Sequence, residues 1–305
     1  MNQYQFHFKD QAFNGAVMVF KKTWPVAILI SLVISLFNSV IQLPLLLKMM
    51  HWDFETLNTL QSRLQEISQI MQKNGDPSSE IESLFGQMNY VMILPFAAIA
   101  CFLYAWNIEL FFQLTQNEIK HQTRSIGLIF KQSFSNQIVT QIVFLIVFGL
   151  LMVISFMLFM LIVTTLAKMA SILGVLVGFI GFFVWLMLML RFLLAPAAIA
   201  LGKYKLNEAF GFSYQNITFK RAAMIGLIGV VVLIGLAILG YAFGALSIPV
   251  SNAIGKQFGT AASYISLQLL NALIGGISNA FIFACSAALY YRYSNDEVLD
   301  NTTEI

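Results

Sequence analysis

The chain has 305 residues, of which 59% are hydrophobic and only 10% are charged. A soluble domain carries charge on about a quarter of its residues, so this composition excludes an ordinary soluble protein and indicates that a lipid bilayer is the solvent. The net charge of +3 is small and the basic residues of the chain form no block. We therefore expect membrane lipids as partners and do not expect nucleic acid.

Six apolar runs reach the length of about 20 residues that a membrane-spanning helix needs. The third and fourth runs are separated only by residues 167–171 and predict a tight hairpin. Both are longer than the minimum, which indicates tilt or an extension along the membrane surface. The sequence therefore predicts an all-α, six-helix transmembrane bundle forming a single domain over 1–305, with spans at 25–47, 91–114, 138–166, 172–201, 222–244 and 263–290.

Lysine and arginine set the orientation, because loops on the cytoplasmic side carry an excess of both. With the N-terminus inside, the inner segments hold 12 of these residues and the outer loops hold 5, namely Lys48, Arg63, Lys73, Lys168 and Lys256. We therefore expect a multi-pass protein with both termini in the cytoplasm.

The outer loop 48–90 is the largest part of the chain outside the predicted spans. Between residues 53 and 73 its apolar positions recur every three or four residues, which predicts a helix with one apolar face. This face would pack either on the membrane surface and the spans or on another chain. The face consists of Leu57, Leu60, Leu64, Ile67 and Met71.

A short amphipathic stretch with flanking lysines precedes each odd-numbered span, a pattern typical of helices that lie at the membrane surface. The stretches cover 13–24, 125–136 and 207–219. Their apolar positions include Phe13 in the first stretch and Tyr214 in the third. The sequence thus suggests an interfacial helix plus a helical hairpin, repeated three times.

Two charges lie within predicted spans, where a charge is costly and is usually kept for a use. Glu109 lies 18 residues into the second span and Arg191 lies 19 residues into the fourth, so both are near the inner edge of the hydrocarbon. We predict an ion pair between them, either structural or lining a cavity open to the cytoplasm. In the alternative, Arg191 reaches to the lipid headgroups and Glu109 lies in interfacial water.

Polar side chains also share faces within two spans. Such groups usually form hydrogen bonds between helices, and a path for a polar substrate is the alternative. Two glycine pairs, Gly174 with Gly178 and Gly240 with Gly244, predict close helix packing. The polar faces comprise Asn38 and Gln42 in the first span, and Asn271, Ser278 and Asn279 in the last.

Signatures of catalysis and metal binding are missing from the sequence. HExxH, GxSxG, CxxC and the phosphate-binding GxxxxGK[ST] do not occur. Cys101 and Cys285 lie in apolar runs, where lone cysteines pack as small hydrophobic residues. We therefore predict no catalytic, cofactor-binding or metal-binding residues.

Three segments of the sequence carry a resemblance to a known family. They are NEAFGFSYQNITFKRA at 207–222, RFLLAPAAIAL at 191–201 and ALYYRYSND at 288–296. With them the chain resembles the YciC-like bacterial inner-membrane proteins. The layout is also similar to the membrane domain of membrane-anchored glycerophosphodiester phosphodiesterases, although the long loop 48–90 departs from it. The resemblance implies a six-helix inner-membrane protein. It carries no catalytic residues, because the phosphodiesterase chemistry belongs to a separate soluble domain.

These observations favour a non-enzymatic inner-membrane protein that organises the envelope or binds lipid or a partner. The partner would be a second copy of the chain or another membrane protein. The alternative is a transporter or lipid-handling protein with a cavity among the six helices.

Overall fold

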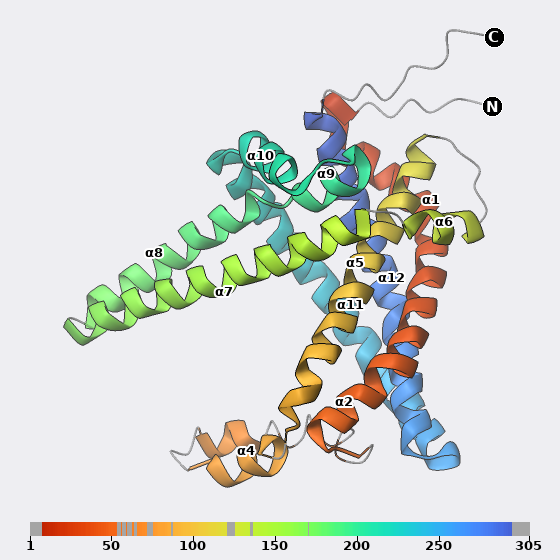
Figure 1. The fold of residues 1–305 in the computed structure, drawn as a ribbon, viewed down its shortest axis with the longest axis vertical. Coiled ribbons are helices and arrows are strands. Elements are labelled where there is room, and N and C mark those ends of the chain that lie inside the picture. The colour runs from red at the N-terminus through yellow and green to blue at the C-terminus, as the bar shows by residue number, and fades with distance from the viewer. Residues whose placement is uncertain are drawn as a thin grey trace. The chain divides into compact units, whose positions relative to one another are not determined.

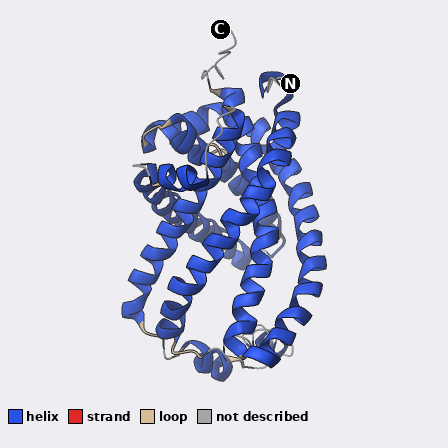
Figure 2. Cartoon of the chain, turned by 90° about the vertical axis from the view of Figure 1, so that its right-hand side faces the viewer, coloured by secondary structure: helices blue, strands red, loops and turns tan. Residues whose placement is uncertain are grey.

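The computed structural model describes residues 8–53, 66–71, 76–86, 88–120, 126–134, 137–169 and 171–294, together with positions 56, 59 and 63. The described elements are all helices (Figure 2). Six of them are long and apolar enough to cross a membrane, which confirms the predicted number of spans. The candidate spans are Ala12–Met50, Tyr90–Ile119, Gln137–Lys168, Gly174–Gly202, Phe219–Phe258 and Ala261–Tyr293.

The first span is a helix with a local irregularity. It consists of α1 (Phe8–Phe37), the π-helical turn η1 (Asn38–Gln42) and α2 (Leu43–Met50). Pro44 explains the irregularity, because proline has no N–H and its ring clashes with the carbonyl four residues earlier. Within the widened turn, the Leu43 N–H donates to the carbonyl of Asn38, five residues back.

The chain divides into two compact units. Unit 1 comprises residues 1–27, 104–237 and 278–305, and unit 2 comprises residues 28–103 and 238–277. The remaining elements are α4 (Ser78–Phe85), η2 (Tyr90–Met92), α5 (Ile93–Ile119), α6 (Ile126–Ser133), α7 (Gln137–Met169), α8 (Ser171–Leu190), α9 (Ala195–Gly202), α10 (Leu206–Asn216), α11 (Phe219–Phe258) and α12 (Thr260–Tyr293). The residues of α1, α5, α11 and α12 are divided between the two units.

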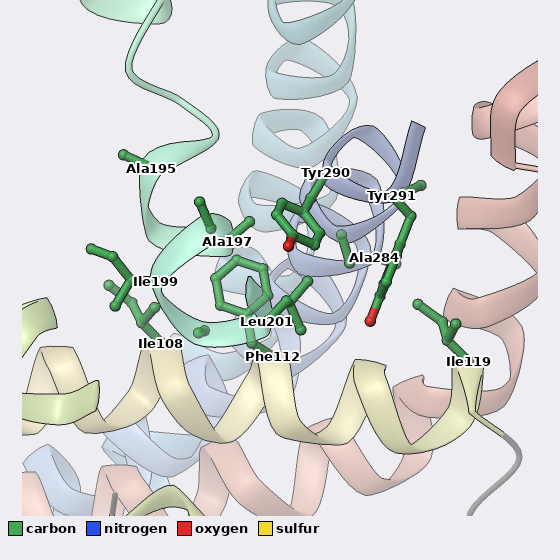
Figure 3. Packing of buried hydrophobic residues seen from close by; sticks show 14 of the residues in the cluster. Ile108, Phe112, Ile119, Ala195, Ala197, Ile199, Leu201, Ala284, Tyr290 and Tyr291 are labelled. Carbon is green, nitrogen blue, oxygen red and sulfur yellow. The ribbon is translucent and has the colours of Figure 1, made fainter. Parts of the chain in front are cut away.

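The core of unit 1 forms around α9, which is buried along almost its whole length. Small side chains such as Ala197 and Ala198 are 0% exposed and let neighbouring helices approach closely. Phe112 of α5 and Tyr290 of α12 pack against this helix (Figure 3). The start of α1 joins the same cluster, so the first and last helices of the chain meet in unit 1.

The predicted hairpin is present as α7 and α8, which run side by side away from α9 and α10 (Figure 1). Glycines of α8 allow the close approach. A Cβ on Gly178 would lie 3.4 Å from Val163, and a Cβ on Gly174 would collide with Ala167. This confirms the packing predicted for the first glycine pair. The second pair, Gly240 and Gly244, does not pack as predicted, because added Cβ atoms there meet nothing within 4 Å among the described residues.

Unit 2 contains the described part of the outer loop. The indole N–H of Trp52 donates to the carbonyl of Leu84 at 2.8 Å, which ties α4 to the end of α2. Positions 66–71 of the predicted outer helix are helical, with Ile67 buried and Met71 exposed. The other residues of the predicted apolar face, Leu57, Leu60 and Leu64, lie outside the described residues.

One sequence-based boundary is wrong. The predicted interfacial stretch 13–24 is not a separate helix, because α1 begins at Phe8 and continues through Pro25. The fourth span predicted at 172–201 agrees with the candidate span Gly174–Gly202, and the regular helix is interrupted within it, because α8 ends at Leu190 and α9 starts at Ala195. The segments predicted at 125–136 and 207–219 do contain separate short helices, α6 and α10.

Candidate functional site: the basic end of unit 1

The break between α8 and α9 begins the site. Pro196 has no N–H, and the proline ring disfavours the helical conformation of the residue before it. The backbone over Arg191–Ala195 therefore tightens, with Leu193 and Ala195 donating to carbonyls three residues back at 3.1 Å and 3.0 Å. This tightening takes the N–H of Leu194 and the carbonyl of Arg191 out of the regular helical ladder.

Ser213 of α10 satisfies both of those backbone groups. Its hydroxyl accepts from the Leu194 N–H at 3.0 Å and donates to the Arg191 carbonyl at 2.7 Å. Ser213 is 0% exposed, so neither group has water as an alternative partner. One buried hydroxyl thus attaches α10 to the break.

The side chain of Arg191 completes this attachment from the other side. Its Nε donates to the carbonyl of Ile217 at 2.9 Å, and one Nη donates to the carbonyl of Tyr214 at 2.7 Å. The guanidinium also lies 3.4 Å from the centre of the Tyr214 ring. A cation at the C-terminal end of a helix is favoured by the helix dipole, so Arg191 fixes the last turn of α10.

Glu109 has different partners. It is fully buried in α5, and its Oε1 accepts a hydrogen bond from Gln113 Nε2 at 3.0 Å. The guanidinium of Arg191 is held by carbonyls of the α10 end and not by this carboxylate. The structure therefore shows no Glu109–Arg191 ion pair in the described part of the chain, and it shows a bonding role for Arg191 that the sequence did not suggest.

The short helix α6 is attached to α5 in a similar way. The indole N–H of Trp106 donates to Ser133 Oγ at 2.8 Å, and Ser133 in turn donates to the carbonyl of Phe130 at 2.7 Å. The Trp106 ring packs against Phe130 and Phe134 with centroid distances of 5.8 Å and 4.8 Å. Phe134 remains 58% exposed.

Exposed cations lie on α6, between α9 and α10, and on or beside the parts of α1, α5, α11 and α12 that belong to unit 1; we call this set the basic end, and Figure 1 shows the ribbon of these elements. Of the acidic side chains described there, Glu118 pairs with Lys22 at 2.9 Å and Glu208 accepts from the Lys205 backbone N–H at 3.0 Å. Most of the positive charge therefore has no carboxylate partner among the described residues. The basic end consists of Lys21, Lys22, Lys120, Lys131, Lys203, Lys205, Lys220, Arg221 and Arg292.

The predicted polar faces fall in both units. Asn38 and Gln42 bound the π-helical turn in unit 2 and are half-buried, and Asn271 is exposed in the same unit. Ser278 and Asn279 are half-buried in unit 1. The expected hydrogen bonds between helices are not found for these five side chains within the described residues.

A longer polar stripe exists on the first span than the sequence pattern indicated. Ser31 and Ser35 precede Asn38 and Gln42 at spacings of three and four, which places all four on one helical face. Ser35 donates to the carbonyl of Gln268 on α12 at 3.3 Å. Ser31 Oγ and Asn38 Oδ1 are buried atoms with no hydrogen-bond partner in the described structure.

Comparisons with known proteins do not identify the chain: no protein-family model, no curated protein and no solved structure matches it. Among the described residues, no group of three or more His, Cys, Asp or Glu side chains is placed to hold a metal ion. The basic end is therefore the feature from which a function can be argued.

Proposed function

We propose that this integral membrane protein is a non-enzymatic, multi-pass protein of a bacterial inner membrane that binds anionic lipid through the basic end of unit 1. In this proposal both termini and the basic end face the cytoplasm. The assignment to the YciC-like group belongs to the same proposal. The observation that carries it is the set of exposed cations of unit 1, of which few have a carboxylate partner among the residues that the structure describes.

The distribution of charge between the units supports the orientation. The described part of unit 1 contains twelve lysines and arginines against four acids, Asp10, Glu109, Glu118 and Glu208, whereas the described part of unit 2 contains Lys48, Arg63 and Lys256 against five acids, Asp53, Glu66, Asp76, Glu80 and Glu82. Lysine and arginine accumulate on the cytoplasmic side of membrane proteins. That side also carries the anionic headgroups, whose negative surface potential attracts each nearby lysine or arginine by about 1 kcal/mol.

Exposed aromatic side chains border the basic end, as expected at the level of lipid headgroups. Trp24, Tyr214 and Phe219 are 41%, 46% and 45% exposed. The rings of Trp24 and Tyr214 insert their apolar part among the acyl chains and leave a polar N–H or O–H group near the headgroups, whereas Phe219 is apolar throughout. Cations and aromatic rings together favour a lipid surface over a soluble partner.

The first experiment is native mass spectrometry of the protein extracted gently from its own membrane. We expect retained anionic phospholipid at a higher fraction than in the bulk membrane. Replacing Lys131, Lys203, Lys205 and Lys220 with Gln should reduce that fraction, whereas Lys48→Gln with Lys256→Gln, the matched change in unit 2, should not. Lipid at the bulk composition in all three proteins would contradict the proposal.

Orientation is tested separately with single cysteines after Cys101 and Cys285 are replaced. A cysteine at Lys203 should react with a membrane-impermeant maleimide only after the membrane is opened. A cysteine at Ser78, which begins α4 in unit 2, should react in intact cells. The reverse pattern would place the basic end outside.

A second candidate, a transporter or lipid-handling protein, is favoured by the polar stripe of the first span. Buried oxygens without a hydrogen-bond partner, at Ser31 and Asn38, are costly unless water or a polar solute reaches them. If water reaches these oxygens, a cysteine at Asn38 will react with a water-soluble thiol reagent in membranes. The control is a cysteine at Val40, which is 70% exposed and would face lipid. An unreactive Asn38 position argues for a dry interface.

A further inference from the structure

Two arginines of the basic end share one aromatic ring. The guanidinium carbon of Arg221 lies 4.6 Å from the centre of the Tyr293 ring, and that of Arg292 lies 5.8 Å from the same centre. Arg221 comes from the start of α11 and Arg292 from the end of α12, so residues about 70 positions apart in the sequence meet here. Both side chains are exposed.

The ring itself is fixed by the core. Tyr293 is half-buried and packs against the buried cluster of Leu194, Ile217 and Ala222. Arg221 is held further by a hydrogen bond from its Nη1 to the carbonyl of Asn216 at 2.7 Å. Because the ring and this bond orient the guanidinium in advance, a ligand would lose little affinity to ordering the side chain.

The charge of this pair is not neutralised within the described structure. Neither Arg221 nor Arg292 forms an ion pair with a described carboxylate. Their distances from the shared ring place the two guanidinium carbons at most about 10 Å apart, which is close to the Debye length in the cell. Salt therefore screens much of the repulsion between the two cations, whereas an anion bound close to both guanidinium groups would be attracted by each of them.

We propose that Arg221 and Arg292, positioned by Tyr293, form a binding site for a phosphate group. A guanidinium donates two parallel N–H groups to phosphate oxygens, and neither of these arginines is paired with a described carboxylate. The phosphate would come from an anionic lipid headgroup or from a soluble phosphate compound. The position favours the lipid, because Arg221 lies near the start of one candidate span and Arg292 near the end of another.

The proposed phosphate site rests on the proposed lipid-binding function and names the residues that would bind the lipid headgroup. The test measures binding of phosphatidylglycerol and phosphatidylcholine to the full chain in detergent by native mass spectrometry. Arg292→Gln is the first variant, because Arg292 makes no hydrogen bond among the described residues. We expect it to weaken phosphatidylglycerol binding several-fold and Arg221→Gln with Arg292→Gln to weaken it by about tenfold or more.

Two matched variants separate specific recognition from general attraction. Lys256→Gln removes one exposed cation at the far end of α11 and should leave phosphatidylglycerol binding unchanged. Replacing both arginines with Lys keeps the charge but removes the two-point hydrogen bonding, so binding should lie between wild type and the double Gln variant. Melting temperature and elution volume confirm that each variant is folded, and a misfolded double variant leaves Arg292→Gln to decide the result.

A second arm identifies the source of the phosphate. Inorganic phosphate is compared with chloride at equal ionic strength for its effect on the melting temperature. A rise in wild type that is lost in Arg292→Gln, without any preference for phosphatidylglycerol, assigns the site to a soluble phosphate compound and removes support for the lipid-binding function. Wild-type preference for phosphatidylglycerol that survives in all the arginine variants, with no phosphate effect, overturns the site and leaves the lipid-binding function standing.

Discussion

Arg191 offers the sharpest test of how unit 1 is built. Its guanidinium makes two hydrogen bonds to carbonyls at the end of α10, one of them to the carbonyl of Ile217, a residue that is 0% exposed. Hydrogen bonds to a charged group contribute about 1.5–3 kcal/mol each, and partial exposure reduces this. Allowing for that exposure, Arg191→Ala should weaken the attachment of α10 by about 3 kcal/mol.

Hydrogen exchange of the α10 backbone amides measures this weakening directly. A loss of about 3 kcal/mol corresponds to roughly a 100-fold increase in the exchange rate of amides that open with α10. Arg191→Lys keeps the charge, so its α10 exchange rate should lie between those of wild type and Arg191→Ala. Lys220→Ala, which removes a neighbouring exposed cation, should leave the exchange of α10 unchanged.

The same assay decides between the observed bonds and the ion pair predicted from the sequence. If Arg191 acts through the carbonyls of α10, exchanging the charges in a Glu109→Arg, Arg191→Glu double variant will not restore protection. Restored protection in that double variant would refute the attachment of α10 through its carbonyls and establish the ion pair. Unchanged exchange in Arg191→Ala would show that Ser213 alone holds α10.

Two further predictions concern other parts of the fold. Gly202→Ala places a methyl group against the Tyr290 hydroxyl and should lower the melting temperature, at a cost of about 1–3 kcal/mol, with partial recovery when Tyr290→Phe is added. Gly211→Ala, whose new methyl group would meet no described atom within 4 Å, should be neutral or slightly stabilising. Ser78 donates to the Asp76 carboxylate through its backbone N–H at 2.9 Å and through its hydroxyl, which lowers the pKa of Asp76 below its ordinary value. Ionised Asp76 therefore stabilises the start of α4 fully at a pH above the ordinary pKa of an aspartate, and this stabilisation is lost as the pH falls through the lower pKa of the folded protein. Hydrogen exchange of α4 should increase over this acidic range in wild type and not in Asp76→Asn.

The number and approximate positions of the spans followed from the sequence because hydrocarbon imposes a minimum apolar length on every spanning helix. The break in the fourth span did not follow, although Pro196 was the available signal. A hydropathy window averages over the proline, and the residues on both sides of the break, 187–190 and 195–201, are otherwise apolar. Length and hydropathy detect membrane crossing and carry no information about a turn within an apolar run.

Burial within the protein did not follow from the periodicity of the amphipathic stretches. The periodicity placed Phe13 on the apolar face of 13–24 and Tyr214 on that of 207–219, and these residues are 58% and 46% exposed. Several of the residues that are buried instead are small, namely Ala12 and Ala16 in α1 and Ala209 in α10. In a membrane, apolar size does not drive burial because lipid is equally apolar, and close packing selects small residues instead.

The arginines of unit 1 differ in how their N–H groups are used. Arg191 and Arg221 each have a tyrosine ring beside them, but Arg191 donates to two backbone carbonyls, whereas Arg221 donates to one, and Arg292 to none in the described residues. A membrane protein that needed these cations only for orientation would not require two of them to converge on one ring fixed by the core. The convergence is explained if Arg191 stabilises the structure and the Arg221–Arg292 pair binds an anion. Substitution of Arg191 should then change the hydrogen exchange of α10, whereas substitution of Arg221 and Arg292 should change phosphate binding.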